Sequence, residues 1–469
     1  MSKKLVIIII TLLLVGCGGQ APATDDDPYT DRLQSSTEDG DASTDASANE
    51  VEEATQEASE PVTLRVAVSL NAEARADFER GLAAIQTEHA NWKIKLESLP
   101  HQGGVEPIAT QITSGTLPDV LLVDGSSVQQ WIRQGAFSNL NGFIVESEVD
   151  LGDFFPGTID QFAYDNKQWG IPNDAVPEVV YYNKEMFDAA GLAYPTDDWS
   201  YEQMREAAKK LTLDGEGRNA TDPDFDAENI VQWGWNRTPQ HIWARHYIRI
   251  WGTDHCTNAD CTLMDLTNPE VVAAYQWWAD MAQEDHSVPV DLYTGEQTGV
   301  AGDPFLAGKA AMGFNNVAAT TQLNEQSTIK YDIVQPFKGV NGNRYGRLST
   351  QGYVIAATSE QQEAAWTLIQ LLTSDPFLTE YVAKPGHSIP ARRSAARFAL
   401  NPDKEPANQQ AILDAMEYEE VFRPFTSSAF EAYDKTNGLF IEAMKGDRPL
   451  EEVLAELEET ANEVLSKDR

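Results

Sequence analysis

Basic residues are scarce in this chain, which has 34 lysines and arginines against 74 aspartates and glutamates among 469 residues. The formal net charge at pH 7 is therefore −40. Phosphate backbones and anionic lipid headgroups bind positively charged surfaces and are repelled by a chain this acidic. The composition predicts that nucleic acids are not partners and that no polybasic patch holds the protein to a membrane.

Catalytic and cofactor-binding motifs are missing as well. The sequence has no Gly-x-Ser-x-Gly elbow, no His-Glu-x-x-His, no Walker loop and no glycine-rich dinucleotide turn. His241 and His246 are wrongly spaced for a zinc site. Asp222, Asp224 and Asp226 alternate like part of a calcium loop but lack its glycine and its bidentate glutamate, so a solvated turn is the simpler interpretation. We expect no metal, no cofactor and no enzymatic activity.

Apolar runs long enough to span a bilayer are also missing. The run at residues 5–15 is too short for a stable membrane helix, and it follows Lys3 and Lys4 as in a secretory signal. It ends in Leu-Val-Gly-Cys, which resembles the lipobox of bacterial lipoproteins, whose cysteine is joined to a lipid and becomes the first residue. The alternative is an ordinary signal peptide with a chance cysteine. We predict a lipoprotein signal at residues 1–17, with Cys17 lipidated as a membrane anchor outside the cytoplasm.

Residues 18–61 contain few large apolar side chains. Such a segment cannot offset the entropy cost of ordering by burial. Its 13 acidic residues are balanced by Arg32 alone, and their repulsion favours an extended chain. We predict a disordered acidic tether here. The folded part keeps a negative surplus of its own, for which a solvated acidic surface is the simplest explanation.

Cysteine is limited to three residues, Cys17, Cys256 and Cys261. With Cys17 assigned to the lipid, the other two form a close pair in a polar loop, and an oxidising compartment favours a disulfide between them. The neighbouring His255 leaves a metal site as the alternative, although no second histidine stands at ligand spacing. We expect the disulfide.

Strand and helix patterns alternate along the rest of the chain. Strands are predicted at residues 62–69, 92–99, 119–124, 310–314, 331–335 and 352–357. Helices are predicted at 105–113, 363–372 and 450–465, with one more beginning at 268–269 and another that carries Phe78, Leu82 and Ile85 on one face. Strands separated by helices imply right-handed crossovers and a mainly parallel sheet covered on both faces. The fold class is therefore α/β. In such sheets ligands bind at the carboxyl edge, where Asn71 and Asp124 follow strands.

Five local sequence patterns are each weak evidence for a protein family, but together and in this order they are specific. They are SGTLPDVLLVD at residues 114–124, GIPNDAVPEVVYYNKEMFDAAGL at 170–192, FLAGKAAMGF at 305–314, GYVIAATSEQQEAAW at 352–366 and IPARRS at 389–394. Together with the lipobox and the tether they resemble the extracellular solute-binding proteins of bacterial ABC importers, in particular the sugar-binding group related to maltose-binding protein.

The resemblance implies a two-lobed, periplasmic-binding-protein-like fold with a hinge and a ligand cleft between the lobes. The first lobe would take residues 62–171 and 355–413, and the second 172–354 and 414–469. The implied partners are a small solute, which we expect to be a sugar, and the permease subunits of an ABC importer. We expect the protein to act as a monomer.

A sugar cleft needs aromatic platforms and a small number of placed polar groups. Trp235 is the platform candidate, and Asp124 and Asp174 are the carboxylates that would accept sugar hydroxyls. For these residues the alternatives are a core tryptophan and surface or helix-capping aspartates. Further candidates from position or resemblance are Asn71, Asn236, Asn315, Gly352, Tyr353, Arg392 and Arg423. Salt bridges are the alternative for the two arginines.

Two other functions remain open from the sequence. Paired carboxylates in a sugar cleft would also describe a carbohydrate-acting hydrolase, although nothing selects two of the 74 acidic residues for that work. A sensor or adhesin lipoprotein that serves no importer is the other.

Overall fold

The computed structural model describes residues 61–99, 105–258, 260–290, 302–418, 420–421 and 427–468. The predicted signal with Cys17, the tether up to residue 60 and the candidate Arg423 lie outside them. The chain divides into two units, Met1–Glu50 and Val51–Arg469, and all described residues belong to the second. None of the helices formed by the described residues is both long and apolar enough to cross a membrane.

The first sheet has five strands in the order β2-β1-β3-β13-β6. These strands are β1 (Val62–Val68), β2 (Trp92–Ser98), β3 (Val120–Asp124), β6 (Ile171–Pro172) and β13 (Gln351–Ile355). Strand β1 runs parallel to both neighbours, while β13 is antiparallel to β3 and β6. The predicted strands in the first part of the chain and their parallel pairing are confirmed.

Helices cover this sheet because their apolar faces need burial. They are α2 (Ala72–Glu88), α3 (Val105–Ser114), α4 (Gly125–Arg133), α5 (Asn141–Glu146), α6 (Pro156–Gln161), α12 (Gln362–Leu372) and α13 (Asp375–Leu378), with the short segments η1 (Leu151–Asp153), β4 (Ala163–Tyr164), β5 (Lys167–Gln168) and η2 (Thr379–Ala383). Helix α2 is typical: Asn71 caps its start, and Phe78, Leu82 and Ile85 are buried on one face.

The second sheet has the order β15-β12-β7-β10-β9-β8, and β11 and β14 also pair with β7. Its strands are β7 (Asp174–Asn183), β8 (Leu213–Asp214), β9 (Ile230–Trp235), β10 (Ala310–Asn316), β11 (Tyr331–Val334), β12 (Arg347–Ser349), β14 (Ile389–Pro390) and β15 (Glu420–Val421). The remaining helices are α7 (Lys184–Ala190), α8 (Tyr201–Leu211), α9 (His246–Arg249), α10 (Pro269–Gln283), α11 (Ala318–Gln326), α14 (Arg393–Ala396), η3 (Arg397–Ala399), α15 (Gln410–Met416), α16 (Ser427–Lys445), α17 (Leu450–Leu465) and η4 (Ser466–Asp468).

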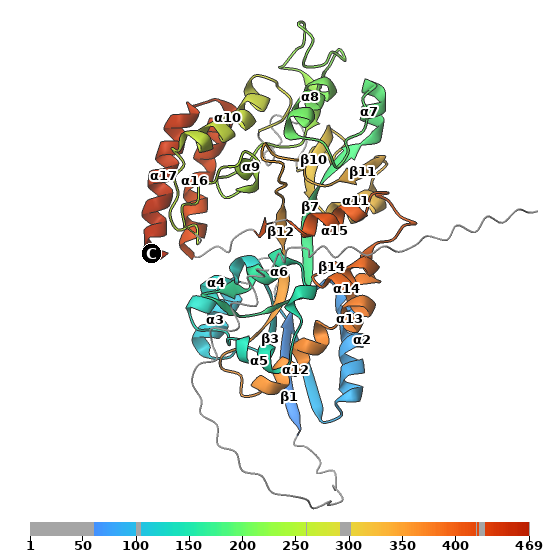
Figure 1. Cartoon of the computed structure of the whole chain (residues 1–469), viewed down its shortest axis with the longest axis vertical. Helices are drawn as coiled ribbons and strands as arrows, with labels where there is room; N and C mark the ends of the chain where they lie inside the picture. Colours follow the sequence, from blue (N-terminus) through green and yellow to red (C-terminus); the bar gives the residue numbers. More distant parts are fainter. Residues whose placement is uncertain are drawn as a thin grey trace, which may run out of the picture. The chain divides into compact units, whose positions relative to one another are not determined.

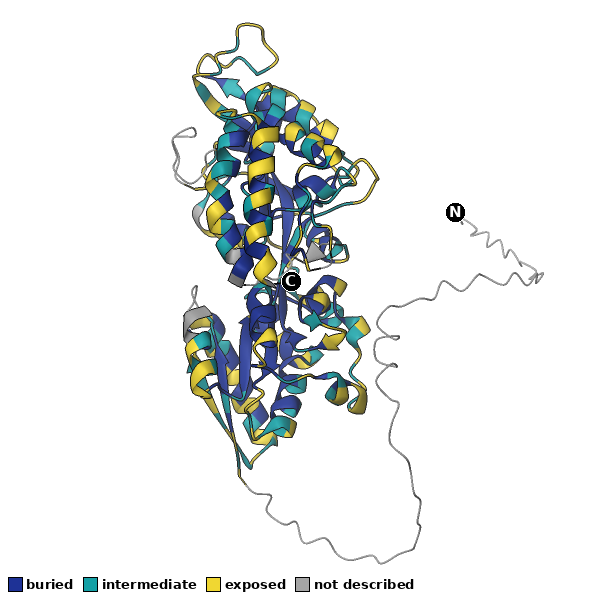
Figure 2. Cartoon of the chain, turned by 90° about the vertical axis from the view of Figure 1, so that its left-hand side faces the viewer, coloured by how far each residue is buried: buried dark blue, intermediate teal, exposed yellow. Residues whose placement is uncertain are grey.

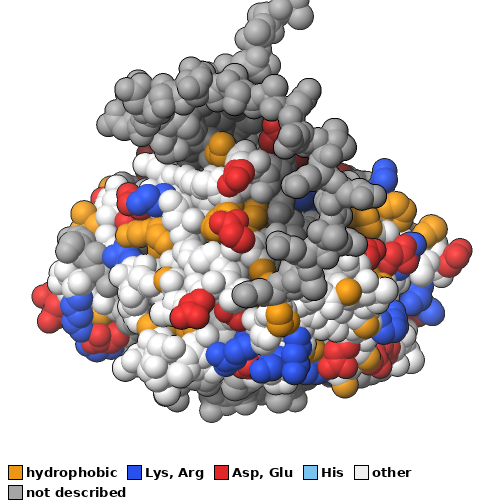
Figure 3. All heavy atoms as spheres, turned by 90° about the horizontal axis from the view of Figure 1, so that it is seen from below, with side chains coloured by type: hydrophobic (Ala, Val, Ile, Leu, Met, Phe, Trp, Pro, Cys, Tyr) orange, Lys and Arg blue, Asp and Glu red, His pale blue; other side chains and the backbone are white. Residues whose placement is uncertain are grey.

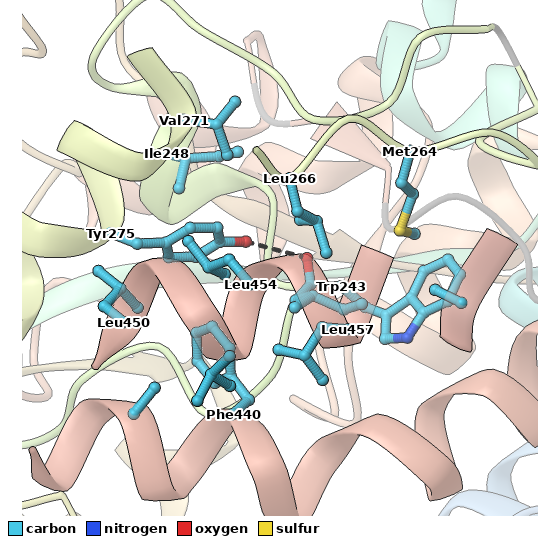
Figure 4. Close-up of a cluster of buried hydrophobic side chains, with 14 of the residues drawn as sticks. Trp243, Ile248, Met264, Leu266, Val271, Tyr275, Phe440, Leu450, Leu454 and Leu457 are labelled. Carbon is cyan, nitrogen blue, oxygen red and sulfur yellow. Dashed lines mark hydrogen bonds between the residues drawn. The ribbon is translucent and has the colours of Figure 1, made fainter. Parts of the chain in front are cut away.

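The last two long helices pack together beside α10 in the second lobe (Figure 1). Their shared core brings Tyr275 of α10 against Phe440 of α16, with Leu454 and Leu457 of α17 alongside (Figure 4). The Tyr275 hydroxyl donates a hydrogen bond to the backbone carbonyl of Ile242 at 3.3 Å, which satisfies the polar end of a buried ring. The amphipathic terminal helix predicted at residues 450–465 is therefore confirmed.

The chain crosses between the two sheets near residues 172–174, 349–351 and 388–392. Strands β7, β12 and β14 meet at this point (Figure 1). Residues 351–354, expected in the second lobe, belong to β13 of the first sheet. Residues 410–413, expected in the first lobe, begin α15, which packs into the core around β7. Both corrections come from pairing and packing between segments far apart in sequence.

Burial follows the two sheets. Figure 2 shows their strands mostly in the buried colour and the outward faces of the helices in the exposed colour. Seen from below, acidic and basic side chains are interspersed over the visible surface (Figure 3). On this face acidic side chains therefore lie beside basic ones.

Trp235 is not a cleft residue, contrary to our prediction. Its side chain is 0% exposed and meets Phe314 edge to face, with ring centroids 5.5 Å apart. It lies in the core between β10 and α8, so no ligand can stack on it. The strand end at Trp235 suggested a surface position, but the parallel pairing of β9 with β10 buries it.

Replacing Trp235 with alanine should therefore lower the stability of the folded protein, whether or not a ligand is bound. The loss of a large buried ring predicts a decrease of about 3 to 5 kcal/mol in the free energy of unfolding. Urea titration followed by circular dichroism would measure it. Trp199→Ala, at a partly buried position on the rim of the same core, should cost less. A Trp235→Ala protein as stable as wild type would contradict the packing.

Candidate functional site

Asp174 stands at the start of β7 and joins the three chain crossings. Its carboxylate accepts a hydrogen bond from the backbone N–H of Gln351 at 2.9 Å, and the Ser388 side chain also hydrogen-bonds it. The hydroxyl of Thr350 donates to the backbone carbonyl of Asp174. One buried residue is thus held by the segment between β12 and β13 and by the segment that enters β14.

The environment of Asp174 favours its protonated form. Burial raises the pKa of this carboxyl to about 6, and the negative charge of Asp124 adds to the shift, while the bonds from Gln351 and Ser388 oppose it. Asp124 is exposed at the end of β3, where it caps α4 by accepting from the backbone N–H of Ser126 at 2.7 Å. The structure therefore brings the two predicted carboxylates close enough to interact.

Three other predicted contacts lie inside the lobes. Tyr353 is 1% exposed within the first lobe, and a Cβ on Gly352 would lie 2.5 Å from the ring of Phe162. Asn236 is fully buried, and its Nδ2 donates to Asp303 at 2.7 Å. Tyr353 and Gly352 are therefore covered by neighbouring residues and cannot contact a ligand, whereas the ligand contact of Asn236 stays a prediction, because its Oδ1 has no hydrogen-bond partner among the described residues.

Asn315 keeps its candidacy. Its side-chain Nδ2 is buried and has no hydrogen-bond partner among the residues that the structure describes. Asn71 is exposed after β1, but its Oδ1 already accepts from the backbone N–H of Ala74 at 2.9 Å as a helix cap.

Arg392 forms a salt bridge, which was the alternative to a ligand contact. Its Nη1 donates to Asp153 at 3.0 Å, its Nε donates to the carbonyl of Thr373 at 2.9 Å, and the guanidinium lies 4.4 Å from the centre of the Phe154 ring. It borders a first-lobe cavity of about 280 Å³ beside Trp366. These contacts use much of the donor capacity that a ligand would need.

A polar cavity of about 70 Å³ lies in the second lobe close to the crossings. Strand β7, the segment between β9 and α9, α9 itself and β12 form it. Its lining residues are Glu178, Arg237, Gln240, His241, Ala244, His246, Tyr247 and Arg347. The register that pairs Leu348 with Pro177 places Arg347 beside Glu178 on neighbouring strands. The cavity therefore gathers residues from segments far apart in the sequence.

Glu178 is the charged centre of this cavity. One carboxylate oxygen lies 3.6 Å from Nη2 of Arg237, and the other lies 3.9 Å from Nε2 of His246. Both distances exceed that of a hydrogen bond. The second oxygen, Oε2, is buried without a hydrogen-bond partner among the described residues. Such a carboxylate is costly in a protein interior unless something donates to it.

The two histidines of the cavity are uncharged at neutral pH. Burial, together with the positive charges of Arg347 and Arg237, lowers the pKa of His241 and of His246 to about 3. Burial alone would lower the pKa of Arg237, but Tyr247, Glu178 and Asp303 outweigh it and raise that pKa. The charges in and beside the cavity are thus two arginines and two carboxylates.

Sequence reasoning missed these residues. Glu178 stands alone as a charge within the apolar run VPEVVYY, and that interruption was the available signal. His241 and His246 were considered only as zinc ligands. Their proximity to Arg237 and Arg347 depends on how β9, α9 and β12 are arranged around β7.

Cys256 and Cys261 are joined as a disulfide, with their Cα atoms 4.8 Å apart. His255 beside them is fully buried, and its Nδ1 lies 3.3 Å from the hydroxyl of Tyr275. The three side chains are grouped closely enough to hold a metal. In the structure, however, the two sulfurs are bonded to each other, so neither is a free thiolate ligand.

Asp174→Asn should change how stability depends on pH. Because the folded pKa of Asp174 is raised above its unfolded value, its stabilising effect is present below about pH 4 and is lost as the pH rises through about 6. Relative to wild type, the variant should gain up to about 3 kcal/mol in unfolding free energy between pH 4 and pH 8. Urea titrations across that range would measure the difference.

Titration of the histidines changes the stability of both proteins equally, so it does not contribute to the difference between them. Asp124→Asn serves as a second variant, since removing its charge should lower the pKa of Asp174 and move the transition to lower pH. Wild-type and Asp174→Asn curves that run parallel from pH 4 to 8 would contradict the raised pKa of the buried carboxyl.

Comparison with known proteins shows which family has this sequence pattern and this fold. The chain matches the sequence model of the family described as "Bacterial extracellular solute-binding protein" over residues 67–376. A putative binding protein of Brucella abortus is 23% identical over 325 residues, 68% of this chain and 74% of that protein. The erythritol/L-threitol-binding protein of Mycolicibacterium smegmatis is 22% identical over 350 residues, 71% of this chain and 70% of that one.

Among solved structures, the sugar-binding protein MalE of Xanthomonas citri superposes with a TM-score of 0.71 at 17% identity, covering 87% of this chain and 98% of that one. This likeness confirms the predicted two-lobed fold. Because the family match extends over more than half of the sequence, the chain belongs to the bacterial extracellular solute-binding proteins.

Proposed function

We propose that this protein captures a sugar or oligosaccharide between its lobes and delivers it to an ABC importer outside the cytoplasm. The observation that carries the proposal is the polar second-lobe cavity with the buried carboxylate of Glu178. Family membership supports an extracytoplasmic solute-binding role. The names of the Mycolicibacterium relative and of MalE support a sugar or a sugar alcohol as the ligand class.

The position of the cavity suits a protein that closes over its ligand. Glu178 lies four residues beyond Asp174 on β7, a distance of about 13 Å along the strand. Asp124 stands at the carboxyl edge of the first sheet and interacts with Asp174. A ligand favours closure only if it contacts the closed state better than the open one. Contacts with Asp124 in one lobe and Glu178 in the other would meet that requirement.

Ligand binding should raise the melting temperature by mass action on the folded state. A thermal-shift screen of monosaccharides, oligosaccharides and sugar alcohols, followed by calorimetry on each hit, would identify the ligand. Small-angle scattering should show compaction when the ligand is added.

Recovery of the ligand chemically unchanged is expected, whereas its turnover would favour the hydrolase alternative. Failure of any importer permease to capture the liganded form would favour the sensor or adhesin.

The proposed anchor is tested separately. If Cys17 is lipidated, a Cys17→Ser protein should be released from membranes or remain unprocessed, because the thioether to the lipid cannot form. Membrane fractionation and mass spectrometry of the mature amino terminus would measure this. Cys256→Ser is the control and should stay membrane-bound. A Cys17→Ser protein that is cleaved normally and still sediments with membranes would refute the anchor.

A further inference from the structure

His255 is a buried histidine whose ring stacks on that of Tyr275, with ring centroids 6.4 Å apart. Its side chain is 0% exposed, and its Nε2 has no hydrogen-bond partner among the residues that the structure describes. A polar atom left unpaired in a protein interior costs free energy, so native proteins seldom keep one without a role. The residues around His255 indicate what that role is.

The contact with Tyr275 fixes which ring nitrogen of His255 carries the proton. The hydroxyl of Tyr275 has a single proton, which it donates to the backbone carbonyl of Ile242 at 3.3 Å (Figure 4). Towards Nδ1 of His255, also at 3.3 Å, the hydroxyl can therefore only accept, so Nδ1 is the protonated nitrogen. The lone pair then belongs to Nε2. Metal-binding histidines are held in this way, with one nitrogen donating and the other free.

Two sulfur atoms lie beside this histidine. A ring nitrogen of His255 and the sulfurs of Cys256 and Cys261 are all within 4.8 Å of one another. Zn²⁺ binds thiolate sulfur at about 2.3 Å and imidazole nitrogen at about 2.1 Å, so the ligand atoms of a tetrahedral site are roughly 3.6 to 3.8 Å apart. Small shifts of the three side chains therefore suffice to surround one ion, provided that the two sulfurs are no longer bonded to each other.

Reduction of the disulfide frees both sulfurs. Cys256 is partly exposed and Cys261 is 4% exposed, so a dithiol reductant reaches the sulfur of Cys256 first. Its thiolate bonds to that sulfur, the bond between the cysteines breaks, and Cys261 leaves as a thiolate. The second thiol of the reductant then displaces Cys256 and closes the reductant into its own disulfide. Two electrons pass to the cysteines, and their two thiols release two protons to solvent when Zn²⁺ binds.

We propose that Cys256, Cys261 and the free ring nitrogen of His255 form a zinc site once the disulfide is reduced, with water as the fourth ligand. Two thiolates and a neutral imidazole cancel the charge of the ion, as a largely buried site requires. The ion then replaces the disulfide as the link across residues 256–261. This inference is separate from the proposed function, because none of the three residues lines the second-lobe cavity.

Cobalt and zinc titrations test the site in the full-length protein with Cys17→Ser, in which Cys256 and Cys261 are the two remaining cysteines. A trialkylphosphine reduces the disulfide without supplying a competing thiol. The reduced protein should bind one Co²⁺ with the thiolate-to-metal absorption band of a tetrahedral site, and Zn²⁺ should displace it. The oxidised protein should not show the band. Absence of the band after reduction, or its presence before reduction, would overturn the inference.

Tyr275→Phe tests the orientation of the histidine, because it removes the hydroxyl that accepts from Nδ1 and keeps the ring. In the reduced state it should bind zinc roughly 10- to 100-fold more weakly, the usual effect of losing a partner that orients a metal ligand. His255→Ala should weaken zinc binding at least as much. His286→Ala changes a histidine outside the described cluster and should bind zinc like the parent protein. Unchanged zinc affinity in His255→Ala would overturn the assignment of His255.

Thermal melts keep the test decisive even if these variants fail to fold. Zn²⁺ should raise the melting temperature of the reduced parent protein by mass action on the folded state. The melting temperature of the oxidised protein should not change, since its sulfurs are bonded to each other. A reduced protein that zinc does not stabilise, or an oxidised protein that zinc stabilises equally, would contradict a zinc site formed by reduction.

Discussion

The pairing of β7 is the constraint on which both lobes depend. This strand pairs with β10 and β11 on one part of its length and with β12 and β14 nearer its start. Val180 and Tyr182 point into one core and Val179 and Tyr181 into the other, because side chains alternate along a strand. A strand buried on both faces needs an almost continuous apolar sequence, and β7 has one. Its two carboxylates, Asp174 and Glu178, are therefore exceptions that require a cause.

Those two carboxylates lie on the same face of β7, since they are four residues apart. Burying each of them costs free energy that an apolar side chain would not. Asp174 offsets part of that cost through bonds with Gln351 and Ser388, which belong to other crossings. Glu178 has arginines nearby, but its Oε2 has no hydrogen-bond partner among the described residues. One strand thus connects a satisfied carboxyl at the crossings with an unsatisfied one in the cavity.

The acidic composition and the cavity have separate physical roles. On the surface seen in Figure 3, acidic side chains are interspersed with basic ones and are solvated. In the cavity, charge is balanced, and burial with two arginines keeps both histidines neutral. Lysine and arginine are scarce in the chain. Two arginines that line one cavity, Arg237 and Arg347, therefore say more about the role of that cavity than the net charge of the chain does. The net charge of a protein governs its repulsion from other molecules of like charge, whereas recognition depends on which charged groups of the protein face those of the bound molecule.

The sequence by itself determined the fold class, the family and some of the regular elements. Period-two and helical patterns predicted β1, β3 and α17 because each element buries one face, or both faces, of a local segment. The capping role of Asp124 was the alternative to a ligand contact, whereas the capping role of Asn71 was not predicted. Only the tertiary structure decided that Trp235 and Tyr353 are core, that β13 belongs to the first sheet, and that Glu178, Arg237 and His246 share a cavity. These outcomes depend on strand pairing and packing between segments far apart in the sequence, and no local pattern encodes which segment will cover a given side chain.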